Sequence, residues 1–175
     1  QIDDGVLSFG DYQDLDLPEG GWYHEAVPVD LDNDGDTDFV TTNNATSIAG
    51  PGGNILEWFE NDGIEGVASF TRHFIAERGG TVVTVYDVDN DGDKDLILPQ
   101  FFGGDALIWM EQTGINGTAW VEHRIDDTTG KGFIVELVDM NGDGQLDLLY
   151  GNHNHQSADA PENQVMGVYW WEIPD

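Results

Sequence analysis

Three short segments of the chain carry aspartates at alternate positions. Each segment fits the template D-x-[DN]-x-D-G-x-x-D, with a glycine at the sixth place. The candidate metal ligands are Asp30, Asp32, Asp34, Asp36, Asp38, Asp87, Asp89, Asp91, Asp93, Asp95, Asp139, Asn141, Asp143, Gln145 and Asp147. Two carboxylates about 4 Å apart repel each other by roughly 4 kcal/mol at an effective dielectric constant near 20. A cation is therefore needed to hold three or four of them together.

The ligand types in these segments favour calcium. Oxygen ligands without histidine or cysteine suit a hard ion. Side chains at places 1, 3 and 5 and the carbonyl at place 7 converge on the ion, and the glycine at place 6 permits a sharp turn, as in an EF-hand. An EF-hand also needs a glutamate at place 12, where this chain has Thr41, Leu98 and Tyr150. We predict three calcium sites of another kind, each closed by the aspartate at place 9. The third is expected to be the weakest, because Asn141 replaces an acid.

The loops belong to a longer repeat that must position them. Their first aspartates, Asp30, Asp87 and Asp139, lie 57 and 52 residues apart, and periods of this size indicate propeller blades or similar arrays. In the second repeat, apolar segments at 83–86 and 96–98 flank the loop, and two segments rich in aromatic and β-branched residues follow. Such runs, separated by glycines, are typical of strands. We predict an all-β protein with a four-stranded antiparallel unit in each repeat and the calcium loop between its first two strands.

The chain has the length of one domain. The predicted repeats are residues 21–78, 79–128 and 129–175. The third repeat lacks a fourth strand, and the segment 4–16 resembles it, with Tyr12 at the place of His73. Propellers commonly complete one blade with strands from both ends, and they typically have four to eight blades. We therefore expect two chains, or two tandem copies, to form a six-bladed ring. A part of a longer propeller is the alternative.

Composition excludes several classes of protein. The 175 residues include 35 acidic and 5 basic ones, which gives a formal net charge of -30. Such a chain repels phosphate backbones and anionic lipid, so we expect neither nucleic-acid binding nor membrane insertion. The 39% share of hydrophobic residues is too high for a disordered acidic tail. The absence of cysteine excludes disulfides and thiolate chemistry.

The repeat resembles the FG-GAP or VCBS family of calcium-loop β-propellers. The likeness rests on residues 29–40, their copy at 86–97, and the segments 57–63 and 69–75. This family includes the head of integrin α chains and many secreted microbial and fungal proteins. The resemblance implies a propeller fold and calcium binding, and it leaves the activity open.

The connections that differ between the repeats form the candidate ligand site, because binding residues concentrate on loops held by a rigid scaffold. Successive connections of an up-and-down sheet alternate between its two ends, so these connections lie opposite the calcium loops. Their amide, histidine and aromatic side chains suit sugar hydroxyls and apolar sugar faces. The candidates are Trp22, Tyr23, Asn43, Asn44, Gln100, Phe101, Phe102, Asn152, His153, Asn154 and His155.

Some residues invite other interpretations. His153 and His155 also fit a transition-metal pair. A glycosidase pair is disfavoured, because nearly all candidate carboxylates belong to the loops. Residues at equivalent places of the repeats are interpreted as structural, with the tryptophans packed between blades. They are His73, His123, Trp58, Trp109 and Trp170.

The function expected from the sequence is non-catalytic recognition by a secreted, calcium-stabilised module. Resemblance to the lectins of the family implies a carbohydrate or glycoprotein ligand. One alternative is a sugar lyase or dehydratase domain with His153 and His155 as acid and base. Another is an integrin-like adhesin that binds a polypeptide. Secretion is favoured because millimolar extracellular calcium fills weak loops, and because glycosylation triplets start at Asn44 and Asn116.

Overall fold

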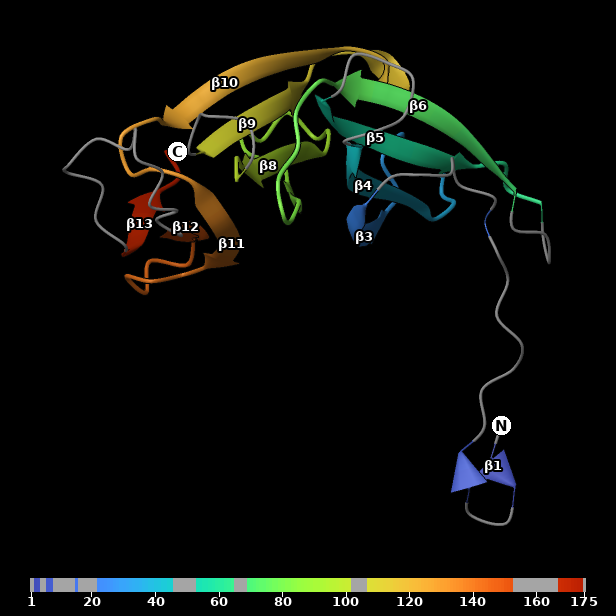
Figure 1. The fold of residues 1–175 in the computed structure, drawn as a ribbon, viewed down its shortest axis with the longest axis horizontal. Coiled ribbons are helices and arrows are strands. Elements are labelled where there is room, and N and C mark those ends of the chain that lie inside the picture. Colours follow the sequence, from blue (N-terminus) through green and yellow to red (C-terminus); the bar gives the residue numbers. More distant parts are fainter. Residues whose placement is uncertain are drawn as a thin grey trace.

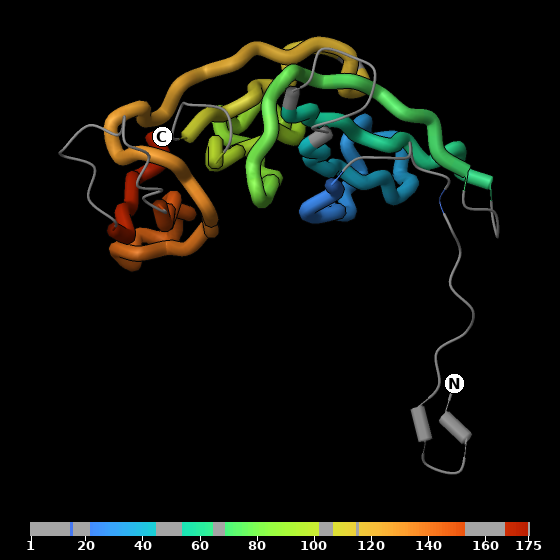
Figure 2. The backbone as a smooth tube through the Cα atoms, viewed as in Figure 1, coloured from blue at the N-terminus to red at the C-terminus, as the bar shows by residue number. Residues whose placement is uncertain are grey.

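The computed structural model describes residues 2–3, 6–7, 15, 22–45, 53–64, 69–101, 107–152 and 167–174. Three antiparallel sheets follow one another along an arc (Figure 1). The backbone passes through them in sequence order, from blue to red (Figure 2). Within the described part, the one helical element is the 3-10 turn η1 (Ile115–Gly117). No described helix has the length and apolar character to cross a membrane.

Each sheet is an up-and-down series of consecutive strands. The first sheet contains β3 (Tyr23–Val29), β4 (Asp38–Ala45), β5 (Gly53–Asn61) and β6 (Phe70–Ala76). The second contains β7 (Thr84–Tyr86), β8 (Asp95–Pro99), β9 (Leu107–Gln112) and β10 (Trp120–Asp126). The third contains β11 (Gly132–Val138), β12 (Asp147–Asn152) and β13 (Val168–Glu172). The prediction of an all-β repeat is confirmed, and each aspartate loop joins the first two strands of its sheet.

The N-terminal segment was predicted to supply the fourth strand of the third repeat. Its described residues form a small hairpin of β1 (Ile2–Asp3) and β2 (Val6–Leu7), in which Ile2 pairs with Leu7. Most of the segment 4–16 lies outside the described residues. The closing strand therefore stays a prediction.

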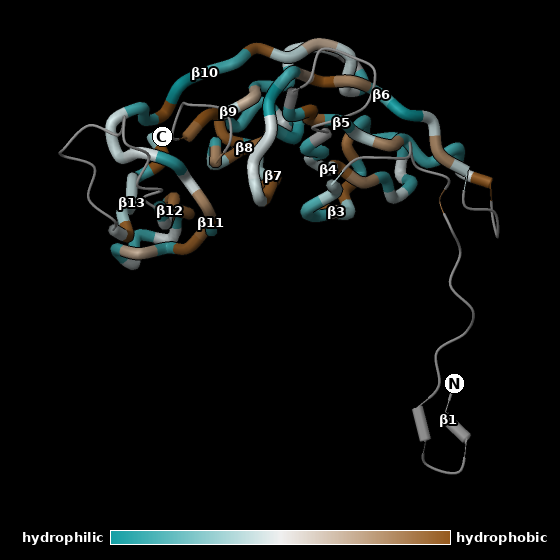
Figure 3. Tube along the Cα trace, viewed as in Figure 1, coloured by the Kyte–Doolittle hydropathy of each residue, from teal (hydrophilic) through white to brown (hydrophobic). Residues whose placement is uncertain are grey.

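Two hydrophobic clusters hold the three sheets together. The first joins Val40, Leu56 and Trp58 of the first sheet to Leu96 and Ile108 of the second. The second cluster joins the other face of the second sheet to the third sheet. Its buried members are Ile97, Leu107, Val135, Leu148 and Tyr150. All five residues of β8 are buried, since this strand has a sheet on each side. Hydrophobic stretches appear accordingly in all three sheets (Figure 3).

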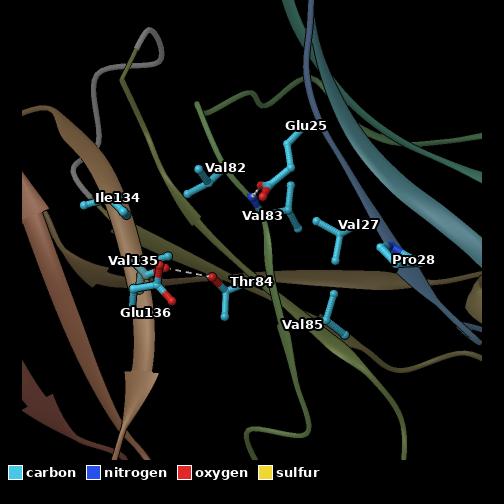
Figure 4. Close-up of a pocket in the computed structure, with 10 residues that line it drawn as sticks. All are labelled: Glu25, Val27, Pro28, Val82, Val83, Thr84, Val85, Ile134, Val135 and Glu136. Atoms are coloured by element: carbon cyan, nitrogen blue, oxygen red, sulfur yellow. Dashed lines mark hydrogen bonds between the residues drawn. The ribbon is translucent and has the colours of Figure 1, made fainter. Parts of the chain in front are cut away.

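The first strands of the three sheets gather around one hollow (Figure 4). This hollow has a volume of about 530 Å³ and is lined by β3, by β7 with the residues before it, and by β11. The Val83 amide donates to the Glu25 carboxylate at 2.9 Å, and the Thr84 hydroxyl donates to the Val135 carbonyl at 3.1 Å. Each first strand thus contacts the first strand of the next sheet. The aspartate loops all follow these inner strands.

Candidate metal centres

The three aspartate loops share one set of side-chain to backbone hydrogen bonds. In the order of the chain, the side chain at place 1 accepts from the amide of place 6 at 3.1, 3.1 and 3.0 Å. The side chain at place 3 accepts from place 5 at 3.2, 3.2 and 3.0 Å. The side chain at place 5 accepts from place 7 at 2.8, 2.9 and 2.8 Å. These short-range bonds are Asx turns, which aspartate and asparagine form readily. The loop conformation therefore follows from the local sequence.

Two places in each loop have a left-handed backbone. The predicted glycine at place 6 has φ of 99°, 102° and 93° in the three loops. Place 4 is also left-handed, with φ of 62° at Asn33, 59° at Asn90 and 80° at Gly142. Asparagine and glycine are the residues that tolerate this conformation best. Place 4 was not among the predicted positions, although it holds asparagine or glycine in all three loops, which is a visible signal.

The aspartate at place 9 accepts backbone hydrogen bonds that connect the loop to its sheet. Asp38 accepts from the Leu31 amide at 3.0 Å and from the Asn61 amide at 2.8 Å. Asp95 does the same in the second loop, through Val88 and Gln112, both at 2.9 Å. In each case the second amide belongs to the end of the third strand. Burial raises the pKa of the Asp38 and Asp95 carboxyl groups, although these hydrogen bonds oppose the shift.

Carboxylates converge in the first two loops. One oxygen each from Asp30, Asp32 and Asp38 lie within 4.8 Å of one another, and the equivalent residues of the second loop, Asp87, Asp89 and Asp95, form the same group. The Oδ1 atoms of Asp30 and Asp87 are buried and accept no hydrogen bond. A buried anionic oxygen without a donor is unfavourable, and a bound cation removes that cost. The chemistry of these residues fits a hard divalent ion.

The groups of converging oxygens contain places 1, 3 and 9 of the predicted ligand set. Place 5 has one oxygen engaged by the amide of place 7. Place 7 was predicted to contribute a carbonyl, so its side chain has no part in the group. Ligation by Asp34, Asp36, Asp91 and Asp93 stays a prediction.

The third loop is closed differently. Both oxygens of Asp139 accept backbone amides, from Gly142 at 2.6 Å and from Gly144 at 3.0 Å. The Asn141 amide nitrogen donates to Asp143 at 2.8 Å and to Glu172 at 3.4 Å. Among the described residues, this loop has no group of three converging carboxylates. Its internal hydrogen bonds support the expectation that it binds calcium most weakly.

Replacing Asn141 by aspartate tests this comparison. Asn141→Asp is expected to raise the calcium affinity of the weakest site by roughly tenfold, because affinity in such loops rises with the number of charged ligands. Isothermal titration calorimetry measures the change. The control is Asn90→Asp, which adds the same charge at place 4 of the second loop, outside the ligand places. Equal effects of the two variants would show that only general charge matters.

The predicted ligand residues fall into two groups by exposure. Trp22 is 64% exposed, whereas Asn43, Asn44 and Gln100 are buried. Asn44 contacts His24 through its side chain, and its amide donates to the Trp22 carbonyl at 3.1 Å. Both polar atoms of the Gln100 side chain and the Asn44 amide oxygen are buried without a hydrogen-bond partner in the described part of the chain. Burial also disfavours glycosylation at Asn44, because a glycan acceptor must reach the surface.

The remaining ligand candidates lie near the same end of the sheets or outside the described residues. Phe101 packs edge to face on Phe133, with ring centroids 5.7 Å apart. The Asn152 side chain accepts from the Gly167 amide at 2.7 Å and contacts the Thr129 carbonyl. Tyr23 pairs across the strands with Asn43. Phe102, His153, Asn154 and His155 lie outside the described residues. The ligand site as a whole stays a prediction.

The structural interpretation of the repeated aromatic residues needs one correction. Trp58 and Trp109 each stack on a histidine of the fourth strand at a centroid distance of 4.4 Å. Those histidines pair with glutamates, His73 with Glu60 at 2.6 Å and the equivalent residue of the second sheet in the same way. These arrangements support a structural role. Trp170, however, is 44% exposed. Its interpretation as core between sheets is wrong within the described chain.

Three stacked antiparallel sheets with aspartate loops define an all-β repeat protein with candidate cation sites. Residues 87–150, from the second loop to β12, match the family model of the FG-GAP-like repeat. This match agrees with the family resemblance of the sequence over that part of the chain. Such repeats often bind calcium and are generally non-catalytic. Comparisons with curated proteins and with solved structures each gave no match.

Proposed function

We propose that this chain is a calcium-stabilised, non-catalytic recognition module whose three sheets are blades of a β-propeller. The observation that carries the calcium proposal is the pair of converging carboxylate groups with buried, unpartnered oxygens on Asp30 and Asp87. Three calcium ions would reduce the formal charge from -30 to about -24. The ions would hold each loop against its sheet. Their role in ligand binding would be indirect, through the stability of the fold.

The proposed ligand is a carbohydrate, bound at the end of the sheets opposite the calcium loops. Trp22 precedes β3, and its carbonyl accepts the Asn44 amide near the end of β4, so it lies at that end. An aromatic ring that is 64% exposed suits the apolar face of a sugar. The connections at this end differ in length and composition between the sheets, whereas the loops at the other end repeat. We place the protein outside the cell, where calcium is millimolar.

A glycan array in calcium tests the carbohydrate proposal. Binding to a defined set of glycans is expected, and Trp22→Ala should weaken it by roughly tenfold or more, which corresponds to about 1.4 kcal/mol. Phe74→Ala is the matched control, because Phe74 is 61% exposed but lies within β6. Absence of glycan binding by the calcium-loaded protein would overturn the proposal. Binding to a partner that survives its deglycosylation would favour a protein adhesin, and steady product formation would favour a sugar lyase.

A further inference from the structure

The third aspartate loop has an Asn-Gly pair where the other two loops have Asp-Asn. Places 3 and 4 hold Asn141 and Gly142 in this loop, and both residues are exposed to solvent. An asparagine followed by glycine is especially prone to deamidation, because glycine has no side chain to hinder attack by its own nitrogen on the asparagine side chain. The third loop therefore has a reactive amide at a place where the repeat otherwise has a charged ligand.

The hydrogen bonds of this pair suit the first step of deamidation. The Gly142 nitrogen, which attacks, donates to Asp139 Oδ1 at 2.6 Å, so a carboxylate is in place to take its proton. Oδ1 of Asn141, where negative charge develops, accepts from the Asp143 amide at 3.0 Å. Nδ2 of Asn141, which leaves, donates to Asp143 Oδ2 at 2.8 Å and to Glu172 Oε1 at 3.4 Å. The attacking, charge-bearing and leaving atoms each have a suitable partner.

We propose that Asn141 is a deamidation site whose product completes the third calcium loop. The Gly142 nitrogen bonds to Cγ of Asn141 and loses its proton, while the bond from Cγ to Nδ2 breaks and the leaving group takes up a proton to depart as ammonia. Water then opens the cyclic imide: its oxygen adds to Cγ, and a proton returns to the Gly142 nitrogen. The backbone stays intact, position 141 carries a carboxylate, and water is the only co-reactant.

The product has an acid at places 1, 3 and 5, as the first two loops do. Calcium affinity in such loops rises with the number of charged ligands, so the weakest of the proposed sites becomes stronger as the protein ages. Water can also open the imide at the main-chain carbonyl, which gives isoaspartate. That product lengthens the backbone by a methylene group and separates places 1 and 2 from the rest of the loop. The effect on calcium rests on the proposed cation sites, whereas the deamidation itself does not.

The chain has a second Asn-Gly pair, which allows an internal comparison. Asn116 has a left-handed backbone with φ of 59° and belongs to the turn η1. Gly117 is buried, and a Cβ atom there would lie 3.1 Å from the Trp58 ring. At Gly142, outside the chain neighbours, no described heavy atom lies within 4 Å of that position. Packing around Gly117 restricts the backbone rotation that ring closure requires, so we expect a slower reaction at that pair.

Peptide mapping by mass spectrometry tests the proposal on the full chain, kept in EGTA at neutral pH and sampled over time. The peptide with Asn141 should convert roughly tenfold faster than the peptide with Asn116, because ring closure needs a near-attack geometry. Gly142→Asn is the matched variant: it gives place 4 the residue of the first two loops, which tolerates a left-handed backbone. It should slow conversion by roughly tenfold or more. Equal rates at the two pairs, or an unchanged rate in the variant, would overturn the proposal.

Calcium provides a second readout. A bound ion holds the Asp139 carboxylate and Oδ1 of Asn141, so only the ion-free loop reacts, and a hundredfold excess of calcium over Kd should slow conversion by about a hundredfold. Converted protein, separated from isoaspartate by chromatography, should show the affinity gain of Asn141→Asp in calorimetry. Conversion that leaves calcium binding unchanged would overturn the claim that it completes the loop. Calcium binding by the first two loops without conversion at Asn141 would overturn the inference and leave the proposed function intact.

Discussion

Excess EGTA is expected to lower the midpoint of thermal unfolding by about 10–20 °C. Two sites filled at a hundredfold excess of calcium over Kd contribute roughly 5 kcal/mol to the free energy of unfolding. The midpoint of a domain of this size shifts by about 2–4 °C per kcal/mol. The physical source is the pair of converging carboxylate groups. Without the ion, each group keeps its mutual repulsion and its buried oxygen without a donor. Metal affinity is then part of the folding free energy.

Differential scanning calorimetry with EGTA, and with EGTA followed by excess calcium, measures this effect. Added calcium should restore the original midpoint. Sodium chloride at matched ionic strength is the control, because a chain of charge -30 also gains stability from general screening. An unchanged midpoint in EGTA would contradict the calcium proposal. Equal recovery with sodium chloride would attribute the stabilisation to screening instead of site binding.

Asp95→Ala is expected to reduce the free energy of unfolding by about 3–5 kcal/mol. One buried and one partly buried amide lose their acceptor at roughly 1–3 kcal/mol each, and the second cation group loses a carboxylate. Those amides are Val88 and Gln112, each 2.9 Å from the Asp95 carboxylate. Asp95 is fully buried, so water cannot replace the lost acceptor without rearrangement. The change should be among the most destabilising single substitutions in the chain.

Urea denaturation in saturating calcium measures the difference. Asp93→Ala is the matched control: it removes an aspartate from the same loop at place 7, where the carbonyl is the predicted ligand, so a loss below about 1 kcal/mol is expected. Asp95→Asn should fall between the two, since an amide retains one acceptor oxygen. Equal stability of Asp95→Ala and Asp93→Ala would show that the hydrogen bonds accepted at place 9 do not stabilise the loop.

Much of the fold was predictable because its signals are local. The strands showed as short runs of β-branched and aromatic residues between glycines, and the structure has strands at these places. The loop signals lie within nine residues, so their Asx turns form between near neighbours in the sequence. Place 4 has an equally local signal in Asn33, Asn90 and Gly142, although the predicted loop did not include it.

The candidate site was less predictable where its contacts join distant parts of the chain. Asp38 was predicted as a ligand, but its bond to the Asn61 amide depends on a strand 23 residues away. Asn43 and Gln100 are predicted ligand residues because they lie in connections that differ between the repeats; the folded chain buries both, and their ligand role stays a prediction. Residue type alone does not show whether an amide side chain at the end of a strand is buried or exposed.

The amino-acid sequence by itself determined the repeat, the strand order within each unit, and the oxygen-only loops that favour a hard cation. It did so because these features depend on residues close together in the chain. The tertiary structure alone decided which equivalent residues are core. Trp58 and Trp170 occupy the same place in their repeats, yet one is 1% and the other 44% exposed. The burial of each tryptophan depends on whether another sheet packs against it, and the local sequence does not show which sheet that is.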